Sequence, residues 1–82
     1  MGADTGTRTT RLHLAADPAP ELIERVCRLL RHRGAAVVEL HVRATDPATT
    51  HVDVGLGPAG HVENLVRQLR RLEDVRSVEV IA

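Results

Sequence analysis

Hydrophobic residues alternate with polar residues in four stretches of the chain. In residues 10–15, Leu12 and Leu14 point one way and Arg11 and His13 the other. This period of two predicts a strand with one face toward a core and one toward water. The same pattern predicts further strands over 37–42, 51–56 and 75–81. The positions expected to face inward in these three strands are Val38, Leu40, Val42, Val52, Val54, Leu56, Val78 and Val80.

Two other stretches carry apolar residues every three to four positions, as amphipathic helices do. The first starts at Pro20 and stops at Gly34, which predicts a helix over about residues 20–33. The second follows the turn-forming residues 57–60 and ends at Glu73 and Asp74. The apolar stripes are Leu22, Ile23, Val26, Leu29 and Leu30 in the first helix, and Val62, Leu65, Val66, Leu69 and Leu72 in the second.

The elements follow one another as β-α-β-β-α-β. Right-handed crossovers place the strands in the order fourth, first, third, second, which predicts an α+β fold, a ferredoxin-like sandwich with both helices on one sheet face. The segment 44–50 contains Thr-Asp-Pro and is expected to turn strands two and three into a hairpin. The open face of the sheet should carry Arg11, His13, Glu39, His41, His51, Asp53 and Glu79.

The second strand is expected at an edge of this sheet, where unpaired backbone groups can accept another chain. It contains no Pro and is rich in β-branched residues, so we expect a second copy of the chain to pair there. The expected dimer edge consists of Val37, Val38, Glu39, Leu40, His41 and Val42.

Composition narrows the possible functions. The chain has 82 residues, no aromatic residue other than its five His, one Cys, and 11 basic against 11 acidic residues. One domain is the expectation, with residues 1–9 as a disordered leader and 10–82 as the domain. A single Cys permits no internal disulfide, and no stretch has the length of a membrane helix, so we expect a cytoplasmic protein. Balanced charge and the lack of base-stacking aromatic residues argue against nucleic-acid binding and against a membrane partner.

One segment matches the dinucleotide-binding pattern GxGxxG. It runs from Gly55 to Gly60, with Glu79 about 20 residues on. Pro58 lacks the backbone N–H that a phosphate cradle needs, and a chain of this length cannot build the doubly wound sheet. We interpret the segment as a strand end, a turn and a helix start.

The open sheet face carries the residues with the most reactive chemistry. His13, His41 and His51 share it with Asp53, a set that suits zinc or acid–base work. A flat sheet offers no cleft that excludes water, so a wetted surface or partner contact is the preferred interpretation. We expect no metal site and no catalytic residue, and interpret Cys27 as core filling.

Two helices bear arginines that could form a basic strip: Arg25, Arg28 and Arg31 on the first, and Arg67, Arg70 and Arg71 on the second. Spacing explains them without a ligand, because acidic residues stand four positions before several of them. These pairs are Glu21 with Arg25, Glu24 with Arg28, and Glu63 with Arg67.

Two longer runs carry a family resemblance. The run from Pro20 to Gly34 resembles the first helix of ACT domains, and more closely that of acetolactate synthase small subunits. The run from Val66 to Val75 is similar to their second helix, which leads into a last strand of alternating Val. The resemblance covers nearly the whole chain from Thr10 to Ile81.

This resemblance implies a non-catalytic regulatory subunit. Such a subunit forms an ACT dimer, docks on a large catalytic subunit and raises its activity in branched-chain amino-acid synthesis. Thiamine diphosphate, FAD and Mg would then sit on that partner, and this chain would bind no cofactor. Alternatives are a stand-alone ACT module that senses an amino acid, and a small metal protein built on the open-face histidines.

The resemblance also locates an effector site between two protomers. It would comprise Asp17, Pro18, Ala19, Pro20 and Glu21 of one protomer, and Ala35, Ala36 and Val37 of the other. The family's Asn-x-Pro-Gly pattern is here changed to Pro18, Pro20 and Glu21 at its Asn, Pro and Gly positions. Two prolines remove N–H donors and Glu21 repels a carboxylate at the helix start, so we expect weak or no valine binding.

Overall fold

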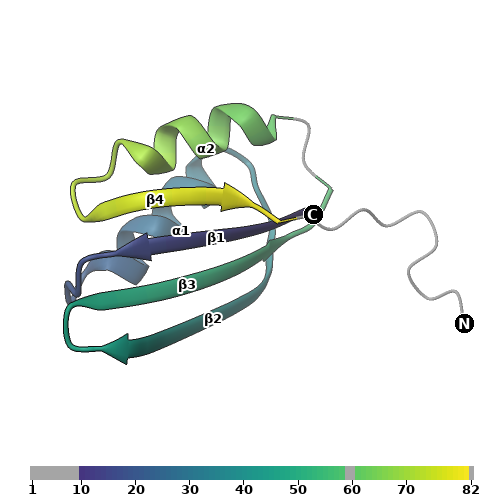
Figure 1. Ribbon diagram of the computed structural model, residues 1–82. Coiled ribbons are helices and arrows are strands. Elements are labelled where there is room, and N and C mark those ends of the chain that lie inside the picture. The colour runs from purple at the N-terminus through teal and green to yellow at the C-terminus, as the bar shows by residue number, and fades with distance from the viewer. Residues whose placement is uncertain (1–9, 59–60, 82) are drawn as a thin grey trace, which may run out of the picture.

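Four antiparallel strands form one sheet, and two helices cover one of its faces (Figure 1). The computed structural model describes residues 10–58 and 61–81. Its elements are β1 (Thr10–Ala16), α1 (Leu22–His32), β2 (Val37–Asp46), β3 (Thr49–Leu56), α2 (Val62–Arg70) and β4 (Val75–Val80). The strand order β2-β3-β1-β4 confirms the α+β ferredoxin-like sandwich. The expected leader at 1–9 lies outside the described residues, and the domain boundary at residue 10 stays a prediction.

The core lies between the sheet and the helices and consists of Leu, Val and Ala side chains. It joins one face of the sheet to the apolar stripes of both helices, and each fully buried Leu or Val contributes about 1.5–3 kcal/mol. Its members are Leu12, Leu14, Ala16, Leu22, Val26, Leu30, Val52, Val54, Leu56, Leu65, Val66, Leu69 and Val78. The periodicity in the sequence therefore selected the correct face of every element, with Val38 of β2 as the exception among the positions expected to face inward.

The ends of α1 explain why the helix is shorter than predicted. Pro20 lies in a turn closed by the Leu22 N–H, which donates to the Ala19 carbonyl at 3.1 Å, so α1 starts two residues later than expected. At the other end, the Gly34 N–H donates to Arg31 O at 3.0 Å and the Ala35 N–H to Leu30 O at 2.9 Å. Gly34 has φ of 78°, as the left-handed position of this C-terminal motif requires. Gly34 therefore ends the helix as predicted.

The hairpin of β2 and β3 is longer than the sequence indicated. β2 continues beyond Val42 to Asp46, which pairs with Thr49 across a two-residue turn at residues 47–48. The Asp46 side chain accepts a hydrogen bond of 2.7 Å from the Ala48 N–H and so fixes this turn. The predicted turn at 44–50 was too wide because its first and last residues pair with each other.

Three valines predicted to face the core are exposed in the single chain. Val38 is 61% exposed, Val42 is 49% exposed and Val80 is 51% exposed. The pairing register shifts between Val37 and Glu39, so Val38 falls in a bulge and leaves the helix side. Val42 does lie on the helix side, paired with buried Val52, but no helix reaches that far across the sheet. Val80 pairs with buried Leu12 and lines an open hollow beside α2, which leaves its side chain only partly covered.

Candidate functional site

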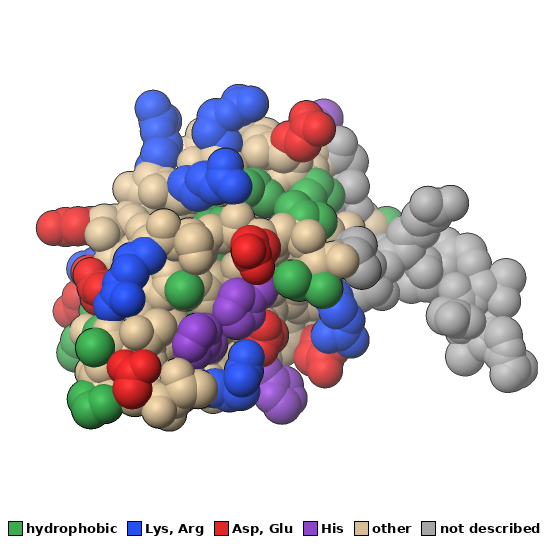
Figure 2. All heavy atoms as spheres, viewed as in Figure 1, with side chains coloured by type: hydrophobic (Ala, Val, Ile, Leu, Met, Phe, Trp, Pro, Cys, Tyr) green, Lys and Arg blue, Asp and Glu red, His purple; other side chains and the backbone are tan. Residues whose placement is uncertain are grey.

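The sheet face opposite the helices gathers the polar residues that the alternation predicted. The register pairs Arg11 with Gly55, and Gly55 with Glu39. One step along, His13 pairs with Asp53 and with Glu79, and Asp53 pairs with His41. The space-filling view shows histidines gathered at the centre of this face with acidic and basic side chains around them (Figure 2). The predicted set of open-face residues is therefore confirmed.

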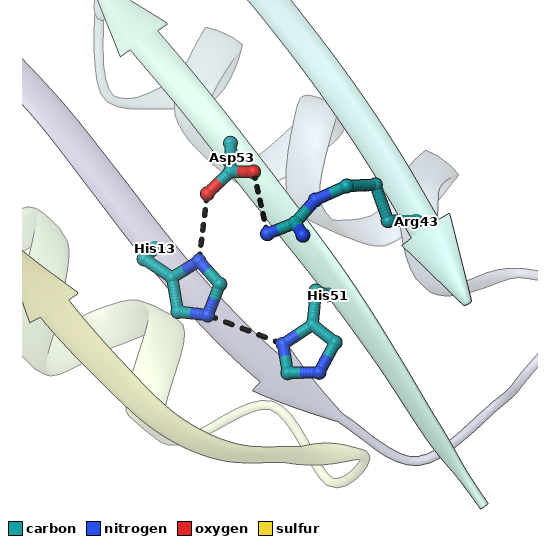
Figure 3. Close-up of polar contacts among 4 residues, drawn as sticks. All are labelled: His13, Arg43, His51 and Asp53. Atoms are coloured by element: carbon teal, nitrogen blue, oxygen red, sulfur yellow. Dashed lines mark hydrogen bonds and ion pairs between the residues drawn. The ribbon is translucent and has the colours of Figure 1, made fainter. Parts of the chain in front are cut away.

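Four of these side chains form a connected group, the polar tetrad of His13, Arg43, His51 and Asp53 (Figure 3). Asp53 Oδ1 lies 2.6 Å from His13 Nδ1, and Asp53 Oδ2 accepts a bond of 3.2 Å from Arg43. His13 Nε2 lies 3.2 Å from His51 Nδ1, and the two rings stack with centroids 5.2 Å apart. Three strands thus supply one continuous chain of polar contacts.

The negative charge of the tetrad lies on Asp53. The pKa of its carboxyl group is lowered, chiefly by the hydrogen bond from His13. Burial acts in the opposite direction, and the charges of His13 and Arg43 and the hydrogen bond from Arg43 lower the pKa further. The His13 side chain is 22% exposed and that of Asp53 is 36% exposed, so the group is partly withdrawn from water. Asp53 is therefore an ionised acceptor that holds both neighbours in place.

A second feature of the open face depends on the missing side chain of Gly55. The Arg11 guanidinium crosses this residue to reach Glu39 on β2 at 2.9 Å. A Cβ atom at Gly55 would stand 3.2 Å from the Glu39 Cβ, which is tighter than most packing contacts and would require Glu39 to shift slightly. The bridge borders an open hollow of about 310 Å³ that is also lined by His41, Asp53 and the exposed Ile81.

The arrangement does not support the metal-protein alternative. Within residues 10–58 and 61–81, no three His, Cys, Asp or Glu side chains gather closely enough to hold a metal ion. His41 lies opposite Asp53 in the register, yet Asp53 directs its oxygens to His13 and Arg43 instead. Arg43 was not among the residues predicted for this face, although extending the alternation of β2 by one step places it there.

The predicted dimer edge is an outer strand of the sheet and is poorly covered. Every described residue of β2 is exposed except Leu40, which is half-buried. Beside β2, α1 borders a hollow of about 460 Å³ lined by Cys27, Arg28, Arg31, Ala35 and Val37, with Glu24 at its rim. Cys27 is only partly buried here and does not belong to the core, so the interpretation of this residue as core filling was wrong. The helix stripe places it at the boundary of the apolar face rather than within it.

The opposite edge of the sheet is formed by β4, and a side chain of α2 occupies one of its backbone acceptors. Arg70 on α2 donates a hydrogen bond of 3.1 Å to the carbonyl oxygen of Val78. The Ile81 N–H donates to Arg11 O, so odd-numbered residues of β4 face β1 and the Val78 carbonyl points outward. Arg70 thus occupies a backbone acceptor that an added strand would need.

The two segments of the predicted effector site lie at opposite ends of the sheet in one chain. Residues 17–21 follow Ala16, which pairs with Thr50, whereas residues 35–37 lie beside Leu56, which pairs with Thr10. A second protomer would therefore be needed to bring them together. The effector site therefore stays a prediction, with the ligand contacts Asp17, Pro18, Ala19, Pro20, Glu21, Ala35, Ala36 and Val37.

The acidic groups at the start of α1 are already occupied. Asp17 accepts a bond of 2.6 Å from Arg76 on β4, and Arg76 also donates to the Ala48 carbonyl. Glu21 accepts a bond of 2.9 Å from Arg25, which also reaches Asp74 at 2.7 Å. Sequence reasoning missed Arg76 because its partners are far away along the chain.

The helix arginines are only partly explained by their spacing. The predicted pair of Glu21 with Arg25 is formed, whereas, among the described residues, Glu24 with Arg28 and Glu63 with Arg67 are not. Arg25 and Arg70 instead join α1 and α2 to other elements. No helix in residues 10–58 or 61–81 has the length and apolar character needed to span a membrane.

A family model for the ACT domain matches residues 18–78, which include both helices, the whole of β2 and β3 and the first four residues of β4. The chain belongs to the ACT domain family. It is 31% identical over 71 residues to the acetolactate synthase isozyme 2 small subunit of Escherichia coli strain K12, covering 85% of this chain and 82% of that protein. The counterpart from Shigella flexneri matches to the same extent.

Solved structures agree on the fold. The acetolactate synthase small subunit of Thermotoga maritima superimposes with a TM-score of 0.80 at 18% identity, over 92% of this chain and 48% of that one. The ACT domain of a GTP pyrophosphokinase from Chlorobium tepidum gives a TM-score of 0.76 at 10% identity, covering 92% and 99% of the two chains. The ACT fold is therefore shared with proteins of differing activity, and the sequence likeness to small subunits has to carry any functional conclusion.

Proposed function

We propose that this ACT protein is the non-catalytic regulatory subunit of an acetolactate synthase and activates the large subunit. The observation that carries the proposal is the 31% identity to the Escherichia coli isozyme 2 small subunit, which extends over most of both chains. Membership of the ACT family supports a regulatory role rather than catalysis. Thiamine diphosphate, FAD and Mg would belong to the large subunit, and the complex would act in the cytoplasm in branched-chain amino-acid synthesis.

The proposed assembly unit is a homodimer formed by antiparallel pairing of two β2 strands. The contrast between the two sheet edges supports it, because Arg70 occupies an outward-facing backbone acceptor of β4, while every residue of β2 except Leu40 is exposed, Val37 and Val42 among them. Burying these side chains against a partner would recover apolar contact that the single chain lacks. A two-fold axis beside β2 would also place the hollow at Cys27 against the second copy.

In this dimer the predicted effector segments become neighbours. Antiparallel β2 strands carry residues 35–37 of one protomer toward the sheet end where residues 17–21 of the other lie. The site would remain a weak one for valine, since Asp17 and Glu21 place two carboxylates there and both bind arginines of the same chain. Activation without tight valine binding is the proposed mode.

Co-expression with the cognate large subunit tests the function directly. We expect the two chains to co-purify and the acetolactate-forming rate of the large subunit to rise when this chain is added. A chain that neither binds the large subunit nor changes its rate would contradict the proposal and favour a stand-alone amino-acid sensor. Calorimetry with valine tests the effector statement separately, and tight micromolar binding to the chain alone would refute it.

A further inference from the structure

The hydrogen bonds of the polar tetrad fix which ring nitrogens carry protons. Ionised Asp53 can only accept, so His13 Nδ1 must donate across the 2.6 Å contact. In a neutral His13, Nε2 then has a lone pair, and His51 Nδ1 must donate across the 3.2 Å contact. A neutral His51 is left with an unprotonated Nε2. This nitrogen is at the end of the ring turned away from His13 (Figure 3).

Only one further proton fits this arrangement. If His51 takes it, the proton resides on Nε2. If His13 takes it, the contact between the rings reverses, His51 Nδ1 becomes the acceptor, and Nε2 of His51 again carries the hydrogen. Uptake of one proton therefore turns the outer nitrogen of His51 from acceptor to donor, whichever ring holds the charge. A second proton would break the bond between the two rings.

The surroundings favour an anion once this proton is bound. Arg43 lies directly opposite His51 in the register and gives one nitrogen to Asp53 at 3.2 Å. When both rings are neutral, the positive charge of Arg43 balances the negative charge of Asp53. When the pair of rings takes up one proton, the tetrad carries one net positive charge. The other titratable residues that the register places beside the tetrad are Glu79 on β4, opposite His13, and His41 on β2, opposite Asp53.

We propose that His51 and Arg43 form a docking point for a carboxylate side chain of the catalytic subunit, and that docking is coupled to uptake of one proton by the His13–His51 pair. The inference rests on the proposed function and specifies which surface meets the partner. The helices cover the other sheet face and the proposed homodimer occupies the β2 edge, so the open face stays accessible to the large subunit. A donor nitrogen beside a guanidinium is a good match for the two oxygens of a carboxylate.

The pH dependence of binding tests this coupling. The affinity of the intact chain for its cognate large subunit would be measured at about pH 6 and about pH 8, on either side of the ordinary histidine range. We expect the His51→Gln variant to lower the affinity at least about fivefold at the lower pH and to have little effect at the higher one. Gln keeps a donor toward His13 but cannot gain a proton. His32→Gln, an exposed histidine at the end of α1, is the matched control and should match the wild type at both pH values.

The outcomes separate this inference from the proposed function. The proton-coupled docking point would be overturned if His51→Gln lost the same affinity at both pH values, or lost none at either. In both cases, binding of the wild type to the large subunit would still support the regulatory role. Failure of the wild type to bind at any pH would overturn both.

Sodium acetate provides a second test on the chain alone. We expect the carbon-bound ring proton signals of His51 to shift saturably with acetate at the lower pH and not at the higher one, with no saturable shift at His32. Equal shifts at both histidines would overturn the site.

Discussion

Arg70 donates its guanidinium hydrogen to the carbonyl oxygen of Val78 at 3.1 Å, across the gap between α2 and the outer side of β4. The contact is partly buried and uses an acceptor that faces away from the sheet. A side chain that fills such an acceptor protects an edge strand from pairing with another chain. The sheet consequently has one protected edge and one open edge.

Removing this hydrogen bond should allow β4 to pair with strands of other chains. We expect Arg70→Ala to lower the free energy of unfolding by about 0.5–1.5 kcal/mol and to produce species larger than the dimer. Arg67→Ala on the same helix removes an equal charge without touching a described backbone acceptor, so it should keep the wild-type distribution. Sedimentation velocity measures the size distribution of both variants. Identical distributions would show that Arg70 does not prevent β4 from pairing with other chains.

The open edge should be where the chain dimerises. Val42 and Val80 have nearly equal exposure, at 49% and 51%, and lie near the two outer edges of the sheet. We expect Val42→Lys to dissociate the dimer because the charge would lie within the proposed β2 pairing, whereas Val80→Lys should leave it dimeric. Light scattering after gel filtration measures both masses. A dimer that survives Val42→Lys but not Val80→Lys would reverse the assignment of the edges.

The end of α1 offers a test of backbone conformation. Gly34 has φ of 78° and nothing lies within 4 Å of the position where a Cβ would stand, so any cost of a side chain there comes from the backbone alone. We expect Gly34→Ala to destabilise the protein by about 1–2 kcal/mol, and Gly34→Asn by less, since Asn tolerates this region. Urea unfolding compares the two. Equal midpoints for Ala and wild type would show that the helix end can relax.

Asp53 should contribute to acid sensitivity. Its pKa is lowered in the folded chain, so its stabilising effect is present above the ordinary value of 3.8 and is lost as pH falls through the lower folded value. We expect Asp53→Asn to be less stable than the wild type near neutral pH and to lose less stability on acidification. Unfolding midpoints across this pH window measure the difference. Glu63→Gln, on the exposed side of α2, is the control. If Asp53→Asn lost as much stability on acidification as the wild type, the proposed contribution of Asp53 to acid sensitivity would be contradicted.

Local pattern was enough to predict the fold. Alternation and helical periods placed Leu12, Leu14 and Val54 in the core, and the crossover rule then gave the observed strand order. Pattern failed at Val38 because a bulge shifts the register by one residue, which no period of two can reveal. It also failed at Val42, since the width of sheet that two helices cover is a tertiary property.

The sequence predicted most of the residues that form the candidate site but not the hydrogen bonds between them. His13, His51 and Asp53 were placed on the same face from alternation alone, and the structure puts them there. That Asp53 binds His13 rather than its direct β2 neighbour His41 depends on side-chain rotamers and on Arg43. Long-range contacts such as Arg76 with Asp17 leave no local signal at all.

The wholly aliphatic core has a practical consequence for studying the complex. With neither Trp, Tyr nor Phe anywhere in the chain, the protein has no intrinsic fluorescence and almost no near-ultraviolet absorbance. In a mixture with an enzyme subunit, every change in tryptophan emission reports on that subunit alone. A single tryptophan introduced on the open face would conversely be an unambiguous probe of this chain.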